Sequence, residues 1–311
     1  MNEFELIARL TRSLPTNPTV VAGAGDDCAV LDLGAPSPWL LFKTDAVVEG
    51  VHFTSDTPPE KVGRKALARC LSDVAAMAGT PVAALVTLGL PGKFDPEVIR
   101  KIYEGLSALA RAHGVAVAGG ETVENHGGLF LSVALLGTAP RGKAVLRSGA
   151  KTGDAIFVTG DLGGSRAGKH LEFEPRLAEA RWLAENFSIH AMIDLSDGLA
   201  GDLRHVLRAS GAGAELLQSA VPIARAARLR AREKPAFAAA LTDGEDFELL
   251  FTVAGPSAVP LLDAWKKQFP KLKLSCIGKV VAGSGITIRN RTGLRELDAR
   301  GYEHFADEPG N

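Results

Sequence analysis

The sequence has few of the residues that disulfide or soft-metal sites require. Its 311 residues include only three cysteines, Cys28, Cys70 and Cys276. They lie far apart, and none belongs to a Cys-x-x-Cys pair or to a Cys/His cluster with metal-ligand spacing. We interpret them as reduced, buried residues that pack as small hydrophobic side chains.

Long apolar runs and long basic runs are also missing. No apolar stretch reaches the roughly 20 uncharged residues of a membrane span, and the start MNEFELIARLTRSL contains acids and lacks a signal-peptide core. The formal net charge is -1, which gives no electrostatic basis for binding nucleic acid or an acidic membrane. We therefore expect a cytoplasmic protein with small-molecule ligands and neither nucleic acid nor membrane as a partner.

What is present indicates a mixed α/β protein. Hydrophobic residues make up 46% of the chain, enough for two domains that each have their own core. Short runs rich in Val, Ile, Leu and Ala alternate with segments of helical period. The polar, basic stretch over 139–154 separates two such series. The sequence thus predicts an N-terminal domain over 1–138 and a C-terminal domain over 139–311.

Two helices are predicted clearly in the first half. One covers 59–79 and ends before Pro81, and the other begins after the N-cap candidate Asp95 and stops at Gly114. In the second half, a loop leading into a helix is expected over 191–211, and another helix over 257–269. The predicted strands cover 20–33, 39–53, 82–90, 115–121, 129–139, 155–160, 247–255, 272–283 and 285–290.

Acidic residues in otherwise apolar stretches are the main chemical signal. The first half places polar ligand atoms in such stretches at Asp26, Asp27, Thr44, Asp45, Asp73 and Glu121. One buried, unpaired carboxylate costs several kcal/mol, and several together take up protons unless cations neutralise them. Ligands that are all hard oxygens select Mg²⁺. The alternative, that each acid is a cap or turn residue, is weakest for Asp73, which lies inside a helical pattern.

Two further acidic segments lie in the second half. In IDLSDGL, Asp194 and Asp197 flank Ser196, so a turn leading into a helix can aim both carboxylates at one phosphate or metal ion. A simple helix cap at Ser196 or Asp197 is the alternative. In DGEDFELLF, Glu245 and Asp246 precede an apolar strand, and ordinary turn acids are again the alternative.

Three other features have both a structural and a functional interpretation. The stretch GGSRAGKH has the glycine and Lys169 spacing of a P-loop, but His170 stands where the motif needs Ser or Thr to bind Mg²⁺. His52 follows Asp45 in a segment expected to line a site, and a buried structural histidine is equally consistent. Arg147 can clamp a phosphate from the stretch between the domains, or it is an exposed linker arginine.

Taken in order, seven segments resemble the thiamine-monophosphate kinase family. They are GAGDDCAV, KTDAVVEGVHF, KALARCLSDVAAMAG, AGGET, RSGAKTGD, AMIDLSDGLAGDL and DGEDFELLFT. That family belongs to the ATP-binding superfamily of aminoimidazole ribonucleotide synthetase and selenophosphate synthetase. The resemblance implies two α/β domains and a homodimer in which the N-terminal sheets of two copies form a barrel.

The resemblance also implies a reaction and its ligands. The family transfers the γ-phosphoryl group of ATP to thiamine monophosphate, giving thiamine diphosphate and ADP. The implied Mg²⁺ ligands are Asp27, Thr44, Asp45, Asp73, Asp194 and Asp197, with Lys43 contributing only its backbone and Glu121 replacing the usual Asp of GGDT. ATP is implied near Tyr103, Gly120, Glu121, Arg147 and Ser196, and the substrate near His52, Glu245 and Tyr302.

The expected mechanism is direct in-line transfer, without a phosphoenzyme or a dedicated base, because the acceptor is already a phosphate anion. Independently of the family, the aromatic ring of Tyr302 suits a cationic thiazolium ring. The alternatives are another ATP-dependent enzyme of the superfamily, a non-catalytic protein that binds Mg-nucleotide, and a P-loop ATPase.

Overall fold

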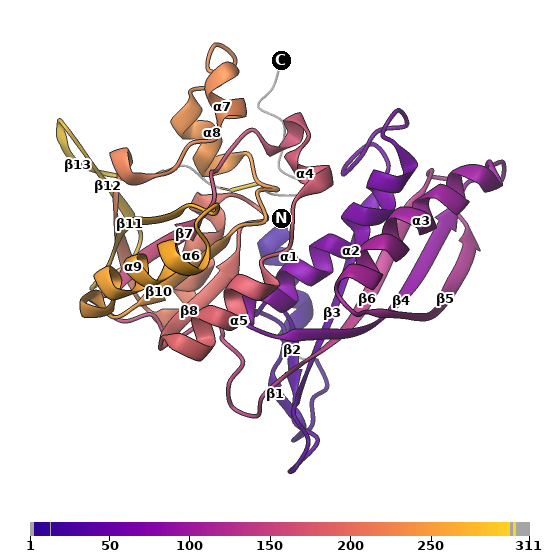
Figure 1. The fold of residues 1–311 in the computed structure, drawn as a ribbon, viewed down its shortest axis with the longest axis horizontal. Helices are drawn as coiled ribbons and strands as arrows, with labels where there is room; N and C mark the ends of the chain where they lie inside the picture. Colours follow the sequence, from indigo (N-terminus) through magenta and orange to yellow (C-terminus); the bar gives the residue numbers. More distant parts are fainter. Residues whose placement is uncertain (1–2, 13, 299–300, 303–311) are drawn as a thin grey trace.

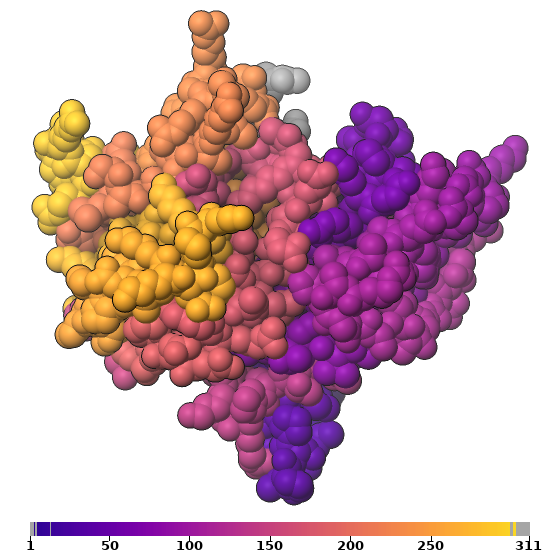
Figure 2. Space-filling model, viewed as in Figure 1, coloured from indigo at the N-terminus to yellow at the C-terminus, as the bar shows by residue number. Residues whose placement is uncertain are grey.

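A computed structural model describes residues 3–12, 14–298 and 301–302. The described chain forms two mixed β-sheets, one from each half of the sequence, with helices packed on them (Figure 1). Figure 2 shows the two halves as adjoining lobes, with a notch between them at the top of the view. The predicted mixed α/β architecture is therefore confirmed.

The N-terminal sheet is open, with β1 and β5 at its edges. Its strands, in spatial order, are β1 (Val20–Ala22), β2 (Ala29–Leu31), β3 (Trp39–Val48), β6 (Phe130–Ala139), β4 (Thr80–Leu90) and β5 (Ala116–Glu124). Only β4 and β5 pair in parallel. The expected barrel is not formed by the described residues of one chain.

Helices α2 (Pro59–Ala76) and α3 (Pro96–Ala112) cover one face of this sheet (Figure 1). Asp95 caps α3 as predicted, because its side chain accepts from the Glu97 N–H at 2.9 Å. The two helices touch backbone to backbone, since a Cβ on Gly63 would lie 1.8 Å from the Ile102 oxygen. Close packing of this kind requires glycine at the crossing.

The C-terminal sheet is covered on both faces. Its strands, in spatial order, are β13 (Gly293–Glu296), β12 (Ile286–Asn290), β9 (Gly213–Leu217), β11 (Leu274–Val281), β7 (Ala155–Thr159), β10 (Leu249–Val253) and β8 (Ile189–Asp194). The helices of this half are α4 (Lys169–Glu172), α5 (Leu177–Asn186), α6 (Leu199–Ser210), α7 (Arg225–Leu229), α8 (Ala236–Thr242) and α9 (Ala258–Gln268). Because both faces are covered, β7 and β10 are buried at every residue.

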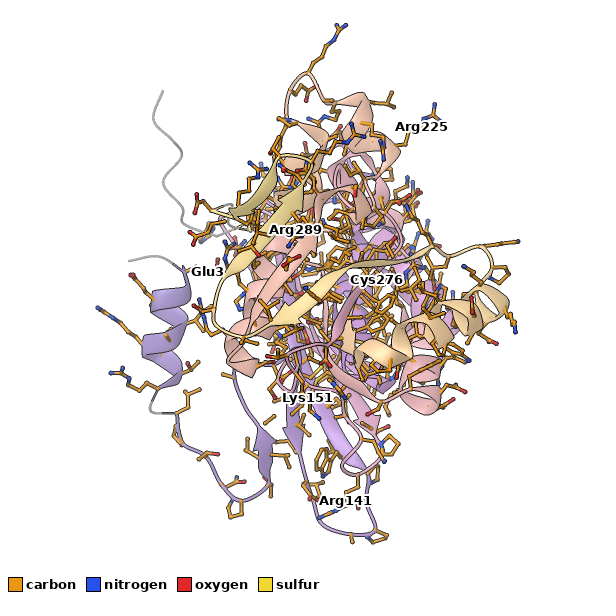
Figure 3. All side chains as sticks on the ribbon, turned by 90° about the vertical axis from the view of Figure 1, so that its left-hand side faces the viewer. Glu3, Arg141, Lys151, Arg225, Cys276 and Arg289 are labelled. Atoms are coloured by element: carbon orange, nitrogen blue, oxygen red, sulfur yellow. The ribbon has the colours of Figure 1, made fainter. Side chains whose placement is uncertain are left out.

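Helix α2 is the element that joins the two halves. It contacts α4, α5 and β8 of the C-terminal half as well as β3, β4 and β6 of its own sheet. One hydrophobic cluster accordingly runs from Leu71 on α2 to Phe157 and Trp265. The N-terminal helix α1 (Glu3–Thr11), by contrast, stands off from the sheets in Figure 3, where Glu3 is labelled. Of the helices described, none is both long enough and apolar enough to cross a membrane.

Several sequence predictions need correction. The expected single strand over 20–33 is two short strands, and GAGDDC forms the loop between them. The loop expected before the 199–210 helix is confirmed only for residues 195–198, because 191–194 belong to the strand β8. The first predicted helix ends at Ala76, three residues earlier than expected, and Pro81 lies within β4. The prediction of reduced cysteines is confirmed; Cys28 and Cys70 are buried, whereas Cys276 is only partly buried.

Candidate functional site

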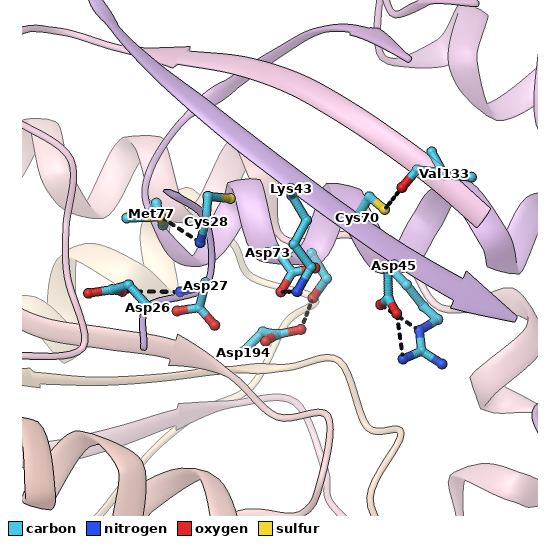
Figure 4. A network of polar contacts seen from close by, with 12 residues as sticks. Asp26, Asp27, Cys28, Lys43, Asp45, Cys70, Asp73, Met77, Val133 and Asp194 are labelled. Carbon is cyan, nitrogen blue, oxygen red and sulfur yellow. Dashed lines mark hydrogen bonds and ion pairs between the residues drawn. The ribbon is translucent and has the colours of Figure 1, made fainter. Parts of the chain in front are cut away.

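Three carboxylates from distant parts of the chain meet between the two sheets. Asp27 lies in the loop before β2, Asp73 near the end of α2, and Asp194 at the end of β8. All three side chains are buried, and one oxygen of each lies within 4.8 Å of one oxygen of each of the others (Figure 4). We call these three residues the carboxylate cluster. The sequence predicted all three as metal ligands, and the structure brings them together.

Each carboxylate of the cluster has one polar partner. Asp73 Oδ1 pairs with the Lys43 ammonium and Asp27 Oδ1 with the Arg147 guanidinium, both at 2.7 Å. Asp194 Oδ2 accepts from the Ser72 hydroxyl at 2.6 Å. Arg147 also donates its main-chain N–H to Asp26 at 3.1 Å, so one arginine holds the adjacent acids Asp26 and Asp27.

One oxygen of the cluster is both fully buried and unpaired among the described residues. Asp27 Oδ2 is buried and accepts no hydrogen bond from the described residues. A buried carboxylate oxygen without a partner is costly, and a hard divalent cation is the ligand that would satisfy it. The residues present therefore fit Mg²⁺, in line with the expectation from their oxygen chemistry.

Burial and mutual repulsion disfavour the ionised form of the acidic side chains in this region. Burial, followed by the nearby Asp27 charge, raises the pKa of both Asp26 and Asp194 to about 6. Burial also raises the pKa of Asp73, although the Lys43 ammonium opposes this shift. The ionised site is therefore unfavourable until a cation arrives.

This charge predicts an unusual pH dependence of the metal-free protein. An unfolded aspartate titrates near its ordinary pKa of 3.8, whereas Asp26 and Asp194 in the folded chain titrate at about 6. Between these values the folded chain binds more protons, so this part of the stability is present at low pH and is lost as the pH rises through 6. We expect the melting temperature in EDTA to fall across this window, less so in Asp194→Asn, and Mg²⁺ to restore it at neutral pH. An equal fall in Asp194→Asn would contradict this origin.

The other predicted ligands of the first half lie around the cluster or face away from it. Asp45 lies on the helix-facing side of β3 and binds the Arg69 guanidinium of α2 at 2.9 Å and 3.1 Å. Thr44 points to the opposite, exposed face, where its hydroxyl lies 3.4 Å from Ser132 Oγ. The Lys43 side chain enters the cluster as a cation, and because an ammonium cannot ligate a metal ion, the expectation that Lys43 offers a metal only its backbone stays a prediction. Burial disfavours its charge, but Asp73 and Asp45 together raise the pKa of Lys43.

The predicted substrate residues share a pocket beside the cluster. The pocket is lined by Val51, His52, Arg69, Arg166, Ser196, Asp197, Asp243, Glu245, Phe247 and Tyr302. Ser196 and Asp197 follow Asp194 by two and three residues, so a single loop connects the cluster with this pocket. The Asp197 carbonyl accepts from the Tyr302 N–H at 2.9 Å, and the Ser196 carbonyl accepts from the Glu245 N–H at 2.7 Å. These contacts fix the pocket wall.

A fully buried lysine, Lys65, contacts two residues that line the pocket, Glu245 and His52. Lys65 on α2 is 0% exposed, and its ammonium contacts Glu245 Oε1 at 2.5 Å, the His52 carbonyl at 2.7 Å and His170 Nδ1 at 2.8 Å. Burial, only partly offset by Glu245, lowers the pKa of Lys65 to about 8. Burial alone would raise the pKa of Glu245, but His170 and Lys65 hold it at about 2. The pair is therefore ionised at neutral pH.

Three of the residues predicted to bind ATP lie elsewhere in the same chain. Gly120 and Glu121 are exposed on the edge strand β5, and Tyr103 is half-buried on α3. The strand order β3-β6-β4-β5 separates Glu121 from Thr44 and Asp45 by three strand spacings, which is about 14 Å. Glu121 lies within β5 rather than at its end. One chain therefore does not bring Glu121 to the predicted metal ligands.

The P-loop interpretation of GGSRAGKH is wrong. The N–H groups of Gly163 and Gly164, which a P-loop would offer to phosphate, donate to the carboxylates of Asp246 and Asp243. Lys169 pairs with the buried Glu248 at 2.9 Å. The donors of the motif are thus engaged inside the protein, and its glycines shape a turn.

Sequence reasoning missed the residues that hold the ligands in place. Ser72 is adjacent to Asp73 in LSDVAAMAG. A polar side chain next to the predicted ligand in an apolar helix was the signal that could have identified it. From the sequence, Arg69 and Lys65 are expected to be exposed helix residues, because charged side chains are rarely buried without a partner and the sequence shows no partner nearby. Their partners Asp45 and Glu245 are 24 and 180 residues away in the sequence, so no local pattern identifies them.

Both halves of the chain are similar to known proteins of one family. Residues 25–139 match the family profile of AIR synthase related protein, N-terminal domain, and residues 148–290 that of the C-terminal domain. Thiamine-monophosphate kinase of Rhodopirellula baltica is 40% identical over 304 residues, covering 94% of this chain and 93% of that protein. The Bacillus subtilis kinase of the same name is 33% identical over 330 residues, covering 98% and 100%. The solved structure of AaThiL complexed with AMPPCP and TMP has a TM-score of 0.81 at 29% identity, covering 98% and 97%.

Proposed function

Because this chain belongs to the thiamine-monophosphate kinase family of AIR synthase related proteins, we propose that it phosphorylates thiamine monophosphate. ATP donates its γ-phosphoryl group to the substrate phosphate, and thiamine diphosphate and ADP are released. The observation that carries the proposal is the buried carboxylate cluster with its unsatisfied Asp27 oxygen. The loop 194–197 places this cluster beside a pocket of suitable chemistry.

The cluster supplies the site for Mg²⁺. Asp27, Asp73 and Asp194 would hold the ion, and we propose Asp45 and Asp197 as ligands of further ions. The Thr44 hydroxyl points to the opposite face of β3, so Thr44 would contribute to this site only through its main chain. When bound, Mg²⁺ neutralises the charge that develops on the transferred phosphoryl group. We propose that Arg147, which is oriented by its ion pair with Asp27, and Ser196 contact the ATP phosphates. The acceptor phosphate is anionic, so we propose in-line transfer without a dedicated base or a phosphoenzyme.

The neighbouring pocket has the chemistry to hold a cationic ring. The Arg166 guanidinium lies 5.4 Å from the centroid of the Tyr302 ring, so this aromatic face already accepts a cation. A thiazolium ring is a cation of comparable size. His52 and Glu245 line the same pocket, and Lys65 fixes the Glu245 carboxylate and the His52 carbonyl behind it.

We further propose a homodimer in which the N-terminal sheets of two copies pack face to face and form a barrel. The face of this sheet opposite α2 carries exposed apolar side chains, including Phe42 and Leu85, each 51% exposed. Exposed apolar surface of this kind is typical of an interface. Thr44 and Glu121 lie on the same face by strand register. A second copy can therefore supply the Gly120–Glu121 segment to the nucleotide, which one chain cannot, whereas Tyr103 lies on α3, which covers the other face of the sheet.

A charge in the middle of this face is expected to separate the dimer. Leu85→Arg would bury a guanidinium against the apolar partner face, where it has no counter-ion. We expect sedimentation velocity to show a shift from dimer to monomer and activity to fall with it. Val259→Arg is the matched control, because Val259 is 68% exposed on α9 of the other half. A Leu85→Arg protein that remains dimeric would exclude this face as the interface.

The proposal also includes the domain limits and the location. We assign 1–138 to the domain that binds ATP and Mg²⁺ and forms the dimer, and 139–311 to the C-terminal domain. The limit lies at Ala139, the last residue of β6, before the connecting segment that carries Arg147. The cytoplasmic location stays a prediction from the sequence, consistent with the use of ATP.

The test is an incubation of purified protein with ATP, Mg²⁺ and thiamine monophosphate, followed by chromatography of all products. Equal amounts of thiamine diphosphate and ADP would support the kinase. ADP without thiamine diphosphate would indicate another acceptor within the superfamily. Nucleotide binding without turnover would support a non-catalytic protein that binds Mg-nucleotide.

A further inference from the structure

Lys43 places a positive charge inside the carboxylate cluster. It lies in the middle of β3, whose backbone is fixed on both sides, with Phe42 paired to Ala29 of β2 and Lys43 to Leu135 of β6. Its side chain points toward α2 and ends with Nζ 2.7 Å from Asp73 Oδ1 (Figure 4). The Lys43 side chain is only 23% exposed. The ammonium therefore belongs to the interior of the site.

Both ends of the cluster have a cation in contact, but only the Asp27 end has a buried oxygen that is left unpaired by the described residues. At one end Asp73 Oδ1 already has a cation in contact. At the other end the Arg147 guanidinium pairs with Asp27 Oδ1 at 2.7 Å, but the second oxygen, Asp27 Oδ2, is buried and has no hydrogen-bond partner among the described residues. A divalent ion that shared Asp73 Oδ1 with the ammonium would meet a like charge at close range, in surroundings that screen poorly. A divalent ion near Asp27 and Asp194 would instead satisfy an oxygen that has no partner.

We infer that the Lys43 ammonium acts as a permanent cation of the carboxylate cluster and takes the place of one divalent metal ion. This inference rests on the proposed metal-nucleotide site and concerns how its charge is divided. The divalent ions bind at the Asp27 and Asp194 end, while Lys43 neutralises Asp73. Lys43 is in this sense a positioning residue for Asp73 and for the metal ions.

The inference is tested by counting bound metal rather than by activity. Mn²⁺ binding is titrated in the presence of a non-hydrolysable ATP analogue, with free Mn²⁺ followed by electron paramagnetic resonance. We expect Lys43→Ala, which removes the charge and opens space, to bind one more Mn²⁺ per chain than the unaltered protein. Lys43→Arg keeps the charge, and we expect it to keep the original number. In EDTA, Lys43→Ala should melt at a lower temperature, and Mn²⁺ should raise that temperature more than in the unaltered protein.

Two results would overturn the inference. Equal numbers of Mn²⁺ in the unaltered protein and in folded Lys43→Ala would mean that the ammonium leaves the cluster when metal binds. An additional ion in Lys43→Arg as well as in Lys43→Ala would mean that side-chain shape, and not charge, sets the number. If the unaltered protein bound no Mn²⁺ with nucleotide, the proposed function itself would fail, which is a different outcome. Should Lys43→Ala fail to fold without metal, purification in Mn²⁺ followed by the same count keeps the test intact.

Discussion

Replacing Asp73 by asparagine is expected to lower the rate of thiamine diphosphate formation on the order of 1,000-fold, because metal stabilisation of transition-state charge is worth several kcal/mol. Asparagine keeps the volume of the side chain but removes its charge from the carboxylate cluster. One oxygen of Asp73 lies within 4.8 Å of one oxygen each of Asp27 and Asp194. Removing its charge therefore weakens the binding of the metal ions that the three residues are proposed to share. Product formation under saturating ATP and Mg²⁺ measures the effect directly.

The control for this variant is Asp95→Asn. It makes the same chemical change at the N-cap of α3, where asparagine caps as well as aspartate, and should retain full activity. Melting temperatures of both variants verify that they fold. An Asp73→Asn enzyme with activity within a few-fold of the original would show that the cluster does not carry the reaction.

Replacing Lys65 by methionine is expected to destabilise the protein by about 3–5 kcal/mol, because it leaves a buried carboxylate without its counter-ion. Lys65 comes from α2, whereas its partners Glu245 and His170 come from the C-terminal half. The variant should therefore also loosen the contact between the halves and raise the KM for thiamine monophosphate. Urea unfolding and substrate titration measure the two effects separately.

The double variant Lys65→Met/Glu245→Gln distinguishes charge from packing. Removing both charges leaves no unpaired buried ion, so we expect it to recover a large part of the lost stability. Activity should remain low, because Glu245 lines the pocket. If the double variant is no more stable than Lys65→Met alone, the loss comes from packing at this position and not from the ion pair.

The sequence predicted the cluster because its members violate local expectation. Asp73 lies in the interior of a helix among apolar residues, where neither a cap nor a solvated charge is expected, and Asp194 ends an apolar strand. A misplaced charge is a local signal. The partner of each charge is not, because it depends on which segments the fold brings together: Lys43 reaches Asp73 only through the position of β3 over α2.

The fold, like the site, was predicted in part from the sequence. The prediction failed where the structure depends on features that no local pattern shows. The helices α2 and α3 have clear periods and end signals, so their starts agree with the structure and their ends lie within three residues of the predicted ones. The short strands β1 and β2 were merged because the turn between them is defined by backbone geometry at Gly25, which has a φ of +123°, and not by an apolar pattern. Glu121 is a different case, since its role depends on an arrangement that the described residues of one chain do not contain.

Helix α2 also sets a length. Lys65, Arg69 and Asp73 recur every four residues, so their side chains lie on one side of the helix. The eight residues from Lys65 to Asp73 correspond to about 12 Å along the axis. The pocket, which Lys65 contacts through Glu245, and the carboxylate cluster, which contains Asp73, are therefore held at a separation that the hydrogen bonds of a single helix define. In the proposed site, we expect a substrate with a shorter or longer distance between its ring and its phosphate to engage only one end, so that molecular length is selected as well as charge.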